Sequence, residues 1–324
     1  MTSEADTRQP KKQNCLVLGA GFIGSHIAEE LVCQGYPVRV FSRTAKPLTG
    51  RREIDQQIDF VVGDFLDRKA LRAALQSVEV VIHCIGTSLP AESNLDPVQD
   101  VQTTIVGALG LLEEATKLGN SVIIYISSGG TVYGIPQSNP ISESHPTSPV
   151  CSYGITNLAV EKYLYLFYHL HGVRYYILRC ANPYGERQDL GRRQGVIAAM
   201  LNAALTEQPF EIWGDGSVIR DYFHVDDLGV AVCKLLERMP STRLMNVGSG
   251  RGISLNDLLE VVEGVMGRKL VVNYSASRPF DVPINVLDIT LAQQVLGWKP
   301  DIGLEEGCLR YWLWLNKQRA RTYG

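Results

Sequence analysis

An α/β protein with a doubly wound parallel sheet and a smaller α/β cap is predicted by three observations. Short apolar segments typical of buried strands alternate with helical segments through the first half of the chain. A glycine-rich turn joins the first strand to the first helix. The chain has 324 residues, of which 45% are hydrophobic, so it is long enough to bury a large core.

The first strand is expected at residues 14–18, and an amphipathic helix is expected to end near residue 33. The turn between them follows the GxGxxG pattern, which permits a tight turn, a close backbone approach to a pyrophosphate and close packing of the helix. The helix N-terminus adds amide groups and a favourable dipole for the same anion. We therefore predict a Rossmann-type dinucleotide site. Its members are Gly19, Gly21, Phe22, Ile23 and Gly24.

The second strand, at residues 38–41, leads to Ser42 and Arg43. An acid is expected at this point in a protein that holds the ribose 2′-hydroxyl of NAD. A guanidinium instead suits a 2′-phosphate, because the two groups form charge-assisted hydrogen bonds. The alternative is a solvated loop arginine. The sequence leaves the choice between NAD and NADP open.

The third strand, at residues 57–62, precedes Asp64 and Phe65. We expect Asp64 to accept a hydrogen bond from the adenine amino group, and Phe65 to belong to the same cofactor site. Asp64 would alternatively cap the next helix, but Asp67 is the better candidate for that role.

The fourth strand, at residues 78–82, runs into His83, and Gly86 and Thr87 follow it. We expect the backbone of Gly86 and Thr87 to line the cofactor. His83 is expected to pack at the strand end, not to act in catalysis.

A helix over residues 96–118 and a fifth strand at residues 122–126 come next. A long apolar helix then runs from Tyr153 to about residue 171, and a sixth strand follows at residues 174–178.

The second half of the chain is less regular. Helices are expected at residues 196–205, 227–238 and 255–266 and at the C-terminus, with a short strand at residues 210–213. The expected division is a tail over residues 1–13, a dinucleotide-binding domain over 14–181 to which 218–248 return, and a substrate-binding cap over 182–217 and 249–324.

Composition excludes several classes of partner. The net charge of −3 does not suggest a surface for nucleic acid or anionic membranes. The seven cysteines lack the spacing of a metal site and favour a reducing, cytoplasmic setting without a bound metal. No apolar run reaches the roughly 18 residues that a membrane span needs.

Several motifs occur in one order along residues 14–316. Together they resemble the extended short-chain dehydrogenases, specifically the nucleotide-sugar epimerase/dehydratase family and most closely its UDP-glucose (UDP-hexose) 4-epimerases. The motifs are Gly21-Phe-Ile-Gly-Ser-His26, Gly63-Asp64, the Ser-Ser and Val-Tyr-Gly elements of residues 127–134, Tyr153, Asn182-Pro-Tyr-Gly185, Trp213-Gly-Asp-Gly216, Arg220-Asp-Tyr-Phe-His-Val-Asp-Asp227, Asn246-Val-Gly248 and Leu296-Gly-Trp-Lys-Pro300.

The resemblance implies that NAD(P) stays bound while the C4 hydroxyl of a UDP-sugar is oxidised to a ketone and the hydride then returns to the opposite face. It makes Tyr153 the base, and it implies a homodimer formed through helices 96–118 and 153–171. Alternatives are a UDP-glucuronate decarboxylase, a reductase, or a catalytically silent nucleotide-sugar-binding protein. The implied substrate ligands are Asn182, Val196, Trp213, Arg220, Tyr222, Arg278 and Asp281.

Two departures from the family pattern concern the catalytic centre. Gly129 stands where the family has a hydroxyl residue, and Ser128 or Thr131 is expected to replace it. Asn157 stands where the family has a lysine that binds the nicotinamide ribose and lowers the tyrosine pKa. Without that cation the phenolate fraction near neutrality falls roughly ten- to a thousand-fold, since a nearby charge shifts a pKa by about 1–3 units. An asparagine amide still offers hydrogen bonds to a ribose hydroxyl.

Overall fold

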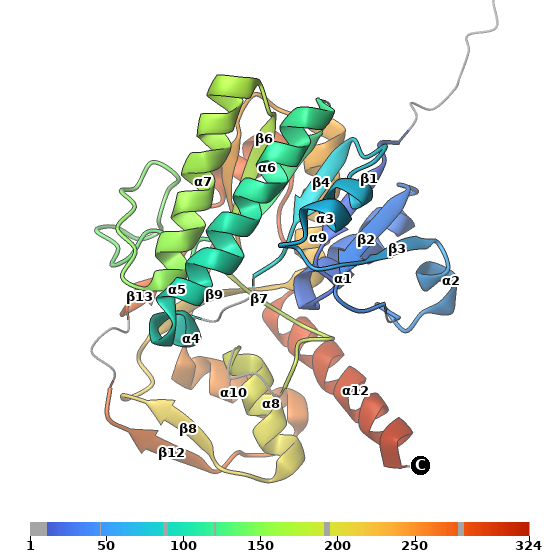
Figure 1. Cartoon of the computed structure of the whole chain (residues 1–324). Coiled ribbons are helices and arrows are strands. Elements are labelled where there is room, and N and C mark those ends of the chain that lie inside the picture. Colours follow the sequence, from blue (N-terminus) through green and yellow to red (C-terminus); the bar gives the residue numbers. More distant parts are fainter. Residues whose placement is uncertain are drawn as a thin grey trace, which may run out of the picture.

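The computed structural model describes residues 12–45, 47–86, 90–119, 121–190, 195–277 and 282–323. Its centre is a parallel sheet of seven strands in the order β10-β6-β5-β4-β1-β2-β3 (Figure 1). The strands are β1 (Cys15–Leu18), β2 (Val38–Ser42), β3 (Ile58–Val62), β4 (Val80–His83), β5 (Val122–Ser128), β6 (Tyr175–Cys180) and β10 (Leu244–Val247). The order reverses beside β1, and a ligand site is expected there, at the carboxyl ends of the strands. The predicted doubly wound sheet is confirmed.

Helices cover both faces of this sheet (Figure 1). α1 (Phe22–Cys33) and α9 (Val225–Arg238) pack on one face, and α3 (Arg68–Ala74), α6 (Gly107–Leu118) and α7 (Ser152–His171) pack on the other. The strands are apolar on both sides because each face is buried beneath helices. α2 (Arg52–Asp55) lies at the edge beyond β3, and α11 (Thr290–Leu296) packs beside α9.

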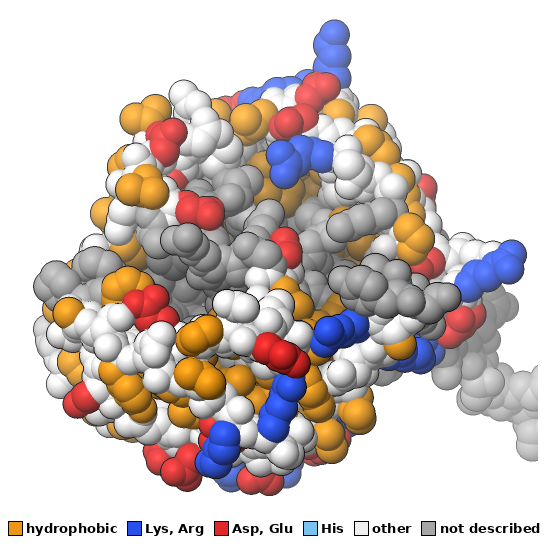
Figure 2. Space-filling view, turned by 90° about the horizontal axis from the view of Figure 1, so that it is seen from below, with side chains coloured by type: hydrophobic (Ala, Val, Ile, Leu, Met, Phe, Trp, Pro, Cys, Tyr) orange, Lys and Arg blue, Asp and Glu red, His pale blue; other side chains and the backbone are white. Residues whose placement is uncertain are grey.

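The cap has its own apolar core. It combines α8 (Val196–Thr206), α10 (Leu255–Met266) and α12 (Leu304–Tyr323) with the parallel pair β8 (Phe210–Trp213) and β12 (Val272–Ser275). A small sheet of β7 (Asn182–Tyr184), β9 (Ile219–His224), β11 (Gly252–Ser254) and β13 (Ile284–Asn285) lies between the cap and the large sheet (Figure 1). Figure 2 views the molecule from the cap side, where the described acidic and basic side chains are interspersed.

The sequence predicts that the segment 218–248 returns to the large domain. Its parts belong to two different sheets. α9 and β10 lie with the large sheet, whereas β9 pairs with the strands of the small sheet. The domain boundaries themselves stay a prediction.

The predicted continuous helix over residues 96–118 is wrong in one respect. The structure has α5 (Pro97–Asp100), a π-helical segment at Val101–Val106, and then α6. Within this segment Thr103 donates its hydroxyl to the carbonyl of Gln99 at 2.9 Å. A threonine side chain that bonds to the preceding turn often bends a helix. α4 (Pro90–Leu95) precedes this run and packs against α7.

None of the helices in the described ranges is both long enough and apolar enough to cross a membrane.

Candidate active site

The glycine turn after β1 has the geometry of a phosphate cradle. Gly19 has a φ of +107°, which an L side chain rarely adopts. A Cβ on Gly24 would lie 1.9 Å from the Gly19 carbonyl oxygen, so this position requires glycine for close packing. A Cβ on Gly21 would meet nothing within 4 Å. Gly21 therefore faces open space beside the α1 N-terminus. In Rossmann folds, backbone amides at such a helix N-terminus bind a pyrophosphate. These residues fit a dinucleotide.

This difference between two glycines leads to a prediction. Gly24→Ala is expected to lower the melting temperature sharply, because its methyl group overlaps the backbone of the turn. Gly21→Ala is expected to leave the melting temperature nearly unchanged but to weaken dinucleotide binding by about tenfold or more, since the methyl group occupies the approach to the pyrophosphate. Thermal melts and cofactor titrations of both variants check this. Equal melting temperatures for the two variants would contradict the assigned packing role of Gly24.

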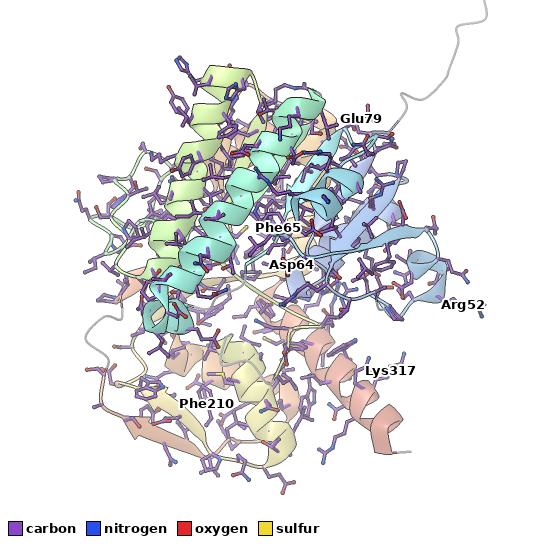
Figure 3. The ribbon with its side chains drawn as sticks, in the orientation of Figure 1. Arg52, Asp64, Phe65, Glu79, Phe210 and Lys317 are labelled. Carbon is purple, nitrogen blue, oxygen red and sulfur yellow. The ribbon has the colours of Figure 1, made fainter. Side chains whose placement is uncertain are left out.

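The residues predicted to contact the adenosine follow β2 and β3, and these contacts stay a prediction. Ser42 ends β2, and the exposed Arg43 follows it. Asp64 accepts a hydrogen bond from the Leu66 amide at 2.8 Å, and Asp67 caps α3 as predicted. Figure 3 shows Asp64 and Phe65 at the rim of the sheet that faces the cap.

Gly86 follows β4, and a Cβ there would meet nothing within 4 Å. Thr87, also predicted to line the cofactor, lies outside the described residues. His83 is buried between Phe65 and Tyr125, with ring centroids 5.1 and 5.2 Å away. Burial lowers the pKa of His83 to about 4, so the imidazole is neutral near pH 7. The packing role predicted for His83 is confirmed.

Tyr153 lies in the first turn of α7, and three residues from α4 and α5 hold this turn in place. Its backbone amide donates to the Ser93 hydroxyl at 3.0 Å. The preceding amide, of Ser152, donates to the Asn94 side chain at 2.9 Å. The buried Asp100 accepts from the hydroxyls of Ser152 and Thr156 at 2.8 and 3.1 Å. The N-terminus of α7 is therefore anchored by a segment more than 50 residues earlier in the chain.

The hydroxyl of Tyr153 is in a desolvated environment. Burial raises its pKa to about 12, above the ordinary value of 10. Asn157, one turn further along, donates to the Tyr153 carbonyl at 2.7 Å and accepts from the Tyr125 hydroxyl at 2.7 Å. Asn157 is only 4% exposed. The first of these bonds lies within α7 and the second joins α7 to β5. A hydrogen bond from the Asn157 side chain offsets part of the rise in the Tyr153 pKa. The predicted contact of Asn157 with a nicotinamide ribose stays a prediction.

The hydroxyl-bearing candidates follow β5. Thr131 Oγ1 is buried and makes no hydrogen bond with the described residues. Ser128 Oγ and Asn182 Oδ1 lie 3.9 and 4.0 Å from the position that a Cβ on Gly130 would take. Ser128 and Asn182 therefore face the same small space at the ends of β5 and β6.

The predicted substrate ligands come together only in part. The β7–β9 register places Asn182 beside Tyr222, and Asn182 Nδ2 donates to the Asp221 carbonyl at 2.8 Å. The half-buried Arg220 precedes them on β9. Val196 opens α8 and packs, like Tyr222, against the cap core. Trp213 ends β8 and is 43% exposed, so it lies outside that core. Arg278 and Asp281 lie outside the described residues.

One polar cluster has no counterpart among the predicted site residues. Candidate metal-ligand atoms of Glu186, His224 and Asp226 lie within 4.8 Å of one another. His224 Nε2 is 3.1 Å from Glu186 Oε2, and Asp226 Oδ1 is 2.5 Å from His26 Nδ1. Since α1 carries His26 and α9 carries Asp226, the cluster joins the helix after the glycine turn to the start of α9.

Sequence reasoning missed Ser93, Asn94, Asp100 and Tyr125. Each forms a hydrogen bond to α7 from another element: Ser93 and Asn94 from α4, Asp100 from α5, and Tyr125 from β5. No local motif marks such residues, because their role depends on a tertiary contact.

Comparisons with known proteins agree with this geometry. Residues 15–248 match the NAD dependent epimerase/dehydratase family. A putative UDP-glucose 4-epimerase of Methanocaldococcus jannaschii is 36% identical over 306 residues, which span 94% of this chain and 98% of that protein. The Thermotoga maritima UDP-glucose 4-epimerase, solved with UDP-glucose, superposes with a TM-score of 0.87 at 33% identity, covering 94% of this chain and 99% of that one. The Thermus thermophilus UDP-glucose 4-epimerase, solved with NAD, has a TM-score of 0.85 at 30% identity and the same coverages, 94% and 99%. This chain belongs to the NAD-dependent epimerase/dehydratase family.

Proposed function

We propose that this chain is a nicotinamide-dependent UDP-hexose 4-epimerase in which Tyr153 is the base. The observation that carries the proposal is that Tyr153 lies on an anchored helix start, in a fold that has the glycine cradle and is shared with UDP-glucose 4-epimerases. The bound nicotinamide would take up a hydride from C4 and return it. A relative solved with NAD supports this class of cofactor.

The protein's own groups would hold and move the protons. Tyr153 would take the proton of the C4 hydroxyl and return it after the sugar has turned over. Asn182 and Arg220 would hold the nucleotide diphosphate, with the arginine pairing with phosphate oxygens; Arg278 is expected to act with them. The UDP-glucose-bound relative supports a UDP-sugar in this position.

Thr131 is proposed as the hydroxyl that donates to the C4 oxygen. Its Oγ1 is buried without a hydrogen bond to the described residues, so it is available to a substrate oxygen. A side chain at Gly129 is disfavoured, because its Cβ would lie 2.6 Å from Leu287 Cδ1 and 3.2 Å from the Arg179 carbonyl oxygen.

Thr131→Val, which preserves shape, is expected to lower turnover by roughly a hundredfold or more, as loss of one preorganised donor does. Ser128→Ala is the matched control and is expected to have a smaller effect. Initial rates with UDP-galactose at saturating cofactor measure both. A larger loss of turnover in Ser128→Ala than in Thr131→Val would indicate that Ser128, and not Thr131, donates to the C4 oxygen.

Identification of the product tests the proposed reaction. Incubation of the purified chain with UDP-galactose should yield UDP-glucose without net cofactor oxidation or reduction. A reductase would consume reduced cofactor in proportion to product, and a decarboxylase would release carbon dioxide from UDP-glucuronate.

A catalytically silent sugar-nucleotide-binding protein is the second candidate. It is favoured by the absence of a lysine at position 157 together with the raised pKa of Tyr153. Tight binding of UDP with no conversion of a UDP-hexose at any pH would support this candidate.

We also propose that the chain forms a homodimer in the cytoplasm. All seven cysteines are free thiols, as is typical of a reducing compartment. On α7, Tyr163 and Phe167 pack against the domain core, whereas Leu166 and Leu170 are 41% and 60% exposed. Replacing both leucines with glutamate should convert a dimer to a monomer in light scattering. An unchanged mass would contradict this interface.

A further inference from the structure

The end of β2 lies where the adenosine ribose of a dinucleotide is expected. β2 pairs with β1 on one side and β3 on the other. The Phe41 carbonyl accepts from the Gly19 amide at 3.0 Å, and the Ser42 carbonyl accepts from the Gly63 amide at 3.0 Å. Ser42 is thereby held between the glycine cradle and the strand end that carries Asp64. In Rossmann folds the residue at this position contacts the 2′ position of the ribose.

No carboxylate occupies this position. Ser42 forms a compact turn in which its hydroxyl donates to the Thr44 carbonyl at 2.5 Å and accepts from the Thr44 amide at 3.2 Å. The nearest acids along the chain have other partners. Asp55 accepts from the amides of residues 48 and 49, Asp59 pairs with Arg39 at 2.7 Å, and Asp64 binds a neighbouring amide.

Arg43 differs from two other arginines of this region. Arg39 pairs with Asp59, and Arg51 pairs with Glu29 at 3.0 Å. Arg43 is exposed and forms neither a hydrogen bond nor an ion pair with any residue that the structure describes. Within the described ranges, no carboxylate lies beside Arg43 that would repel a phosphate group. The guanidinium directly after β2 would form charge-assisted hydrogen bonds with such a group.

We propose that this chain binds NADP(H) in preference to NAD(H), with Arg43 pairing with the 2′-phosphate and with no carboxylate at position 42 to repel it. The inference rests on the proposed dinucleotide site but not on epimerase activity. Ser42 and Arg43 would therefore set specificity for the adenosine half of the cofactor. They take no part in the proton transfer proposed for Tyr153.

The test measures binding of NADPH and NADH to the purified chain, after co-purified nucleotide is removed, by nicotinamide fluorescence and by shift in melting temperature. NADPH should bind about tenfold more tightly or better, as expected for charge-assisted hydrogen bonds. Arg43→Ala should remove this preference and leave the Kd for NADH unchanged. The NADPH preference of the unmodified chain should weaken as salt rises.

Arg52→Ala is the matched control. Arg52 is also exposed and forms no hydrogen bond or ion pair with the described part of the chain, but it lies on α2 at the outer edge of the molecule (Figure 3). It should leave both dissociation constants unchanged. Equal or tighter binding of NADH by the unmodified chain, or an equal loss of both nucleotides in Arg43→Ala, would overturn the proposal. Failure to bind either nucleotide would overturn the dinucleotide site itself, whereas NADPH binding without sugar conversion would count only against the epimerase.

Discussion

Asn157→Lys is expected to raise turnover of UDP-galactose near neutral pH by roughly ten- to a thousand-fold. The base must be deprotonated before it can accept the C4 hydroxyl proton. Burial raises the pKa of Tyr153 to about 12, so very little phenolate is present at pH 7. An ammonium group one helical turn away would favour the phenolate and lower this pKa.

The control for this change is Asn157→Met, because a methionine side chain is about as long as a lysine side chain but carries no charge. Both variants break the hydrogen bonds of Asn157 to Tyr125 and to the Tyr153 carbonyl, so both should lose some stability. Only the lysine form should gain turnover, and its rate should level off at a lower pH. Equal rates for the two variants would show that charge at position 157 does not limit the reaction.

Tyr153→Phe is expected to lower turnover by roughly 10²- to 10⁴-fold, the usual contribution of a positioned acid or base. The loss should fall on kcat, because the bonds that hold the start of α7 use backbone amides and the side chains of residues 93, 94 and 100. The melting temperature and the Kd for the dinucleotide should change little. Rates, melts and cofactor titrations of the same preparation separate these effects.

Retention of more than about a tenth of the activity in Tyr153→Phe would contradict the role of Tyr153 as the base. Thr156→Val is a useful comparison, since Thr156 bonds to Asp100 from the same helical turn. Loss of that bond is expected to lower stability by about 1 kcal/mol without abolishing the reaction.

The sequence predicts the large sheet well because its signals are local. Short apolar strands, the glycine turn and the helix boundaries each follow from a few adjacent residues, and the observed strand order follows the rule for such folds. The π-helical segment at Val101–Val106 interrupts an otherwise continuous helical pattern. The hydrophobic periodicity does not distinguish this segment from the α-helix that follows it.

The site is predicted less completely, for a related reason. Tyr153 and the glycines follow motifs with fixed spacing. Asp100 and Tyr125, by contrast, reach α7 across 52 and 32 residues of sequence. The hydrogen bonds of Asn157 are equally hard to predict from the sequence. The chemistry of its amide suits a ribose hydroxyl, but in the folded chain the amide bonds to Tyr125 and to the Tyr153 carbonyl.

The pH dependence of UDP-galactose conversion by the unmodified chain tests the proposed mechanism most directly. If Tyr153 acts as the base with a pKa of about 12 and without a lysine at position 157, turnover should rise about tenfold per pH unit between pH 7 and 10 without reaching a plateau. Formation of UDP-glucose along such a profile is the predicted result. A rate that is already independent of pH at 7, or no conversion at any pH while UDP and cofactor bind, would contradict it.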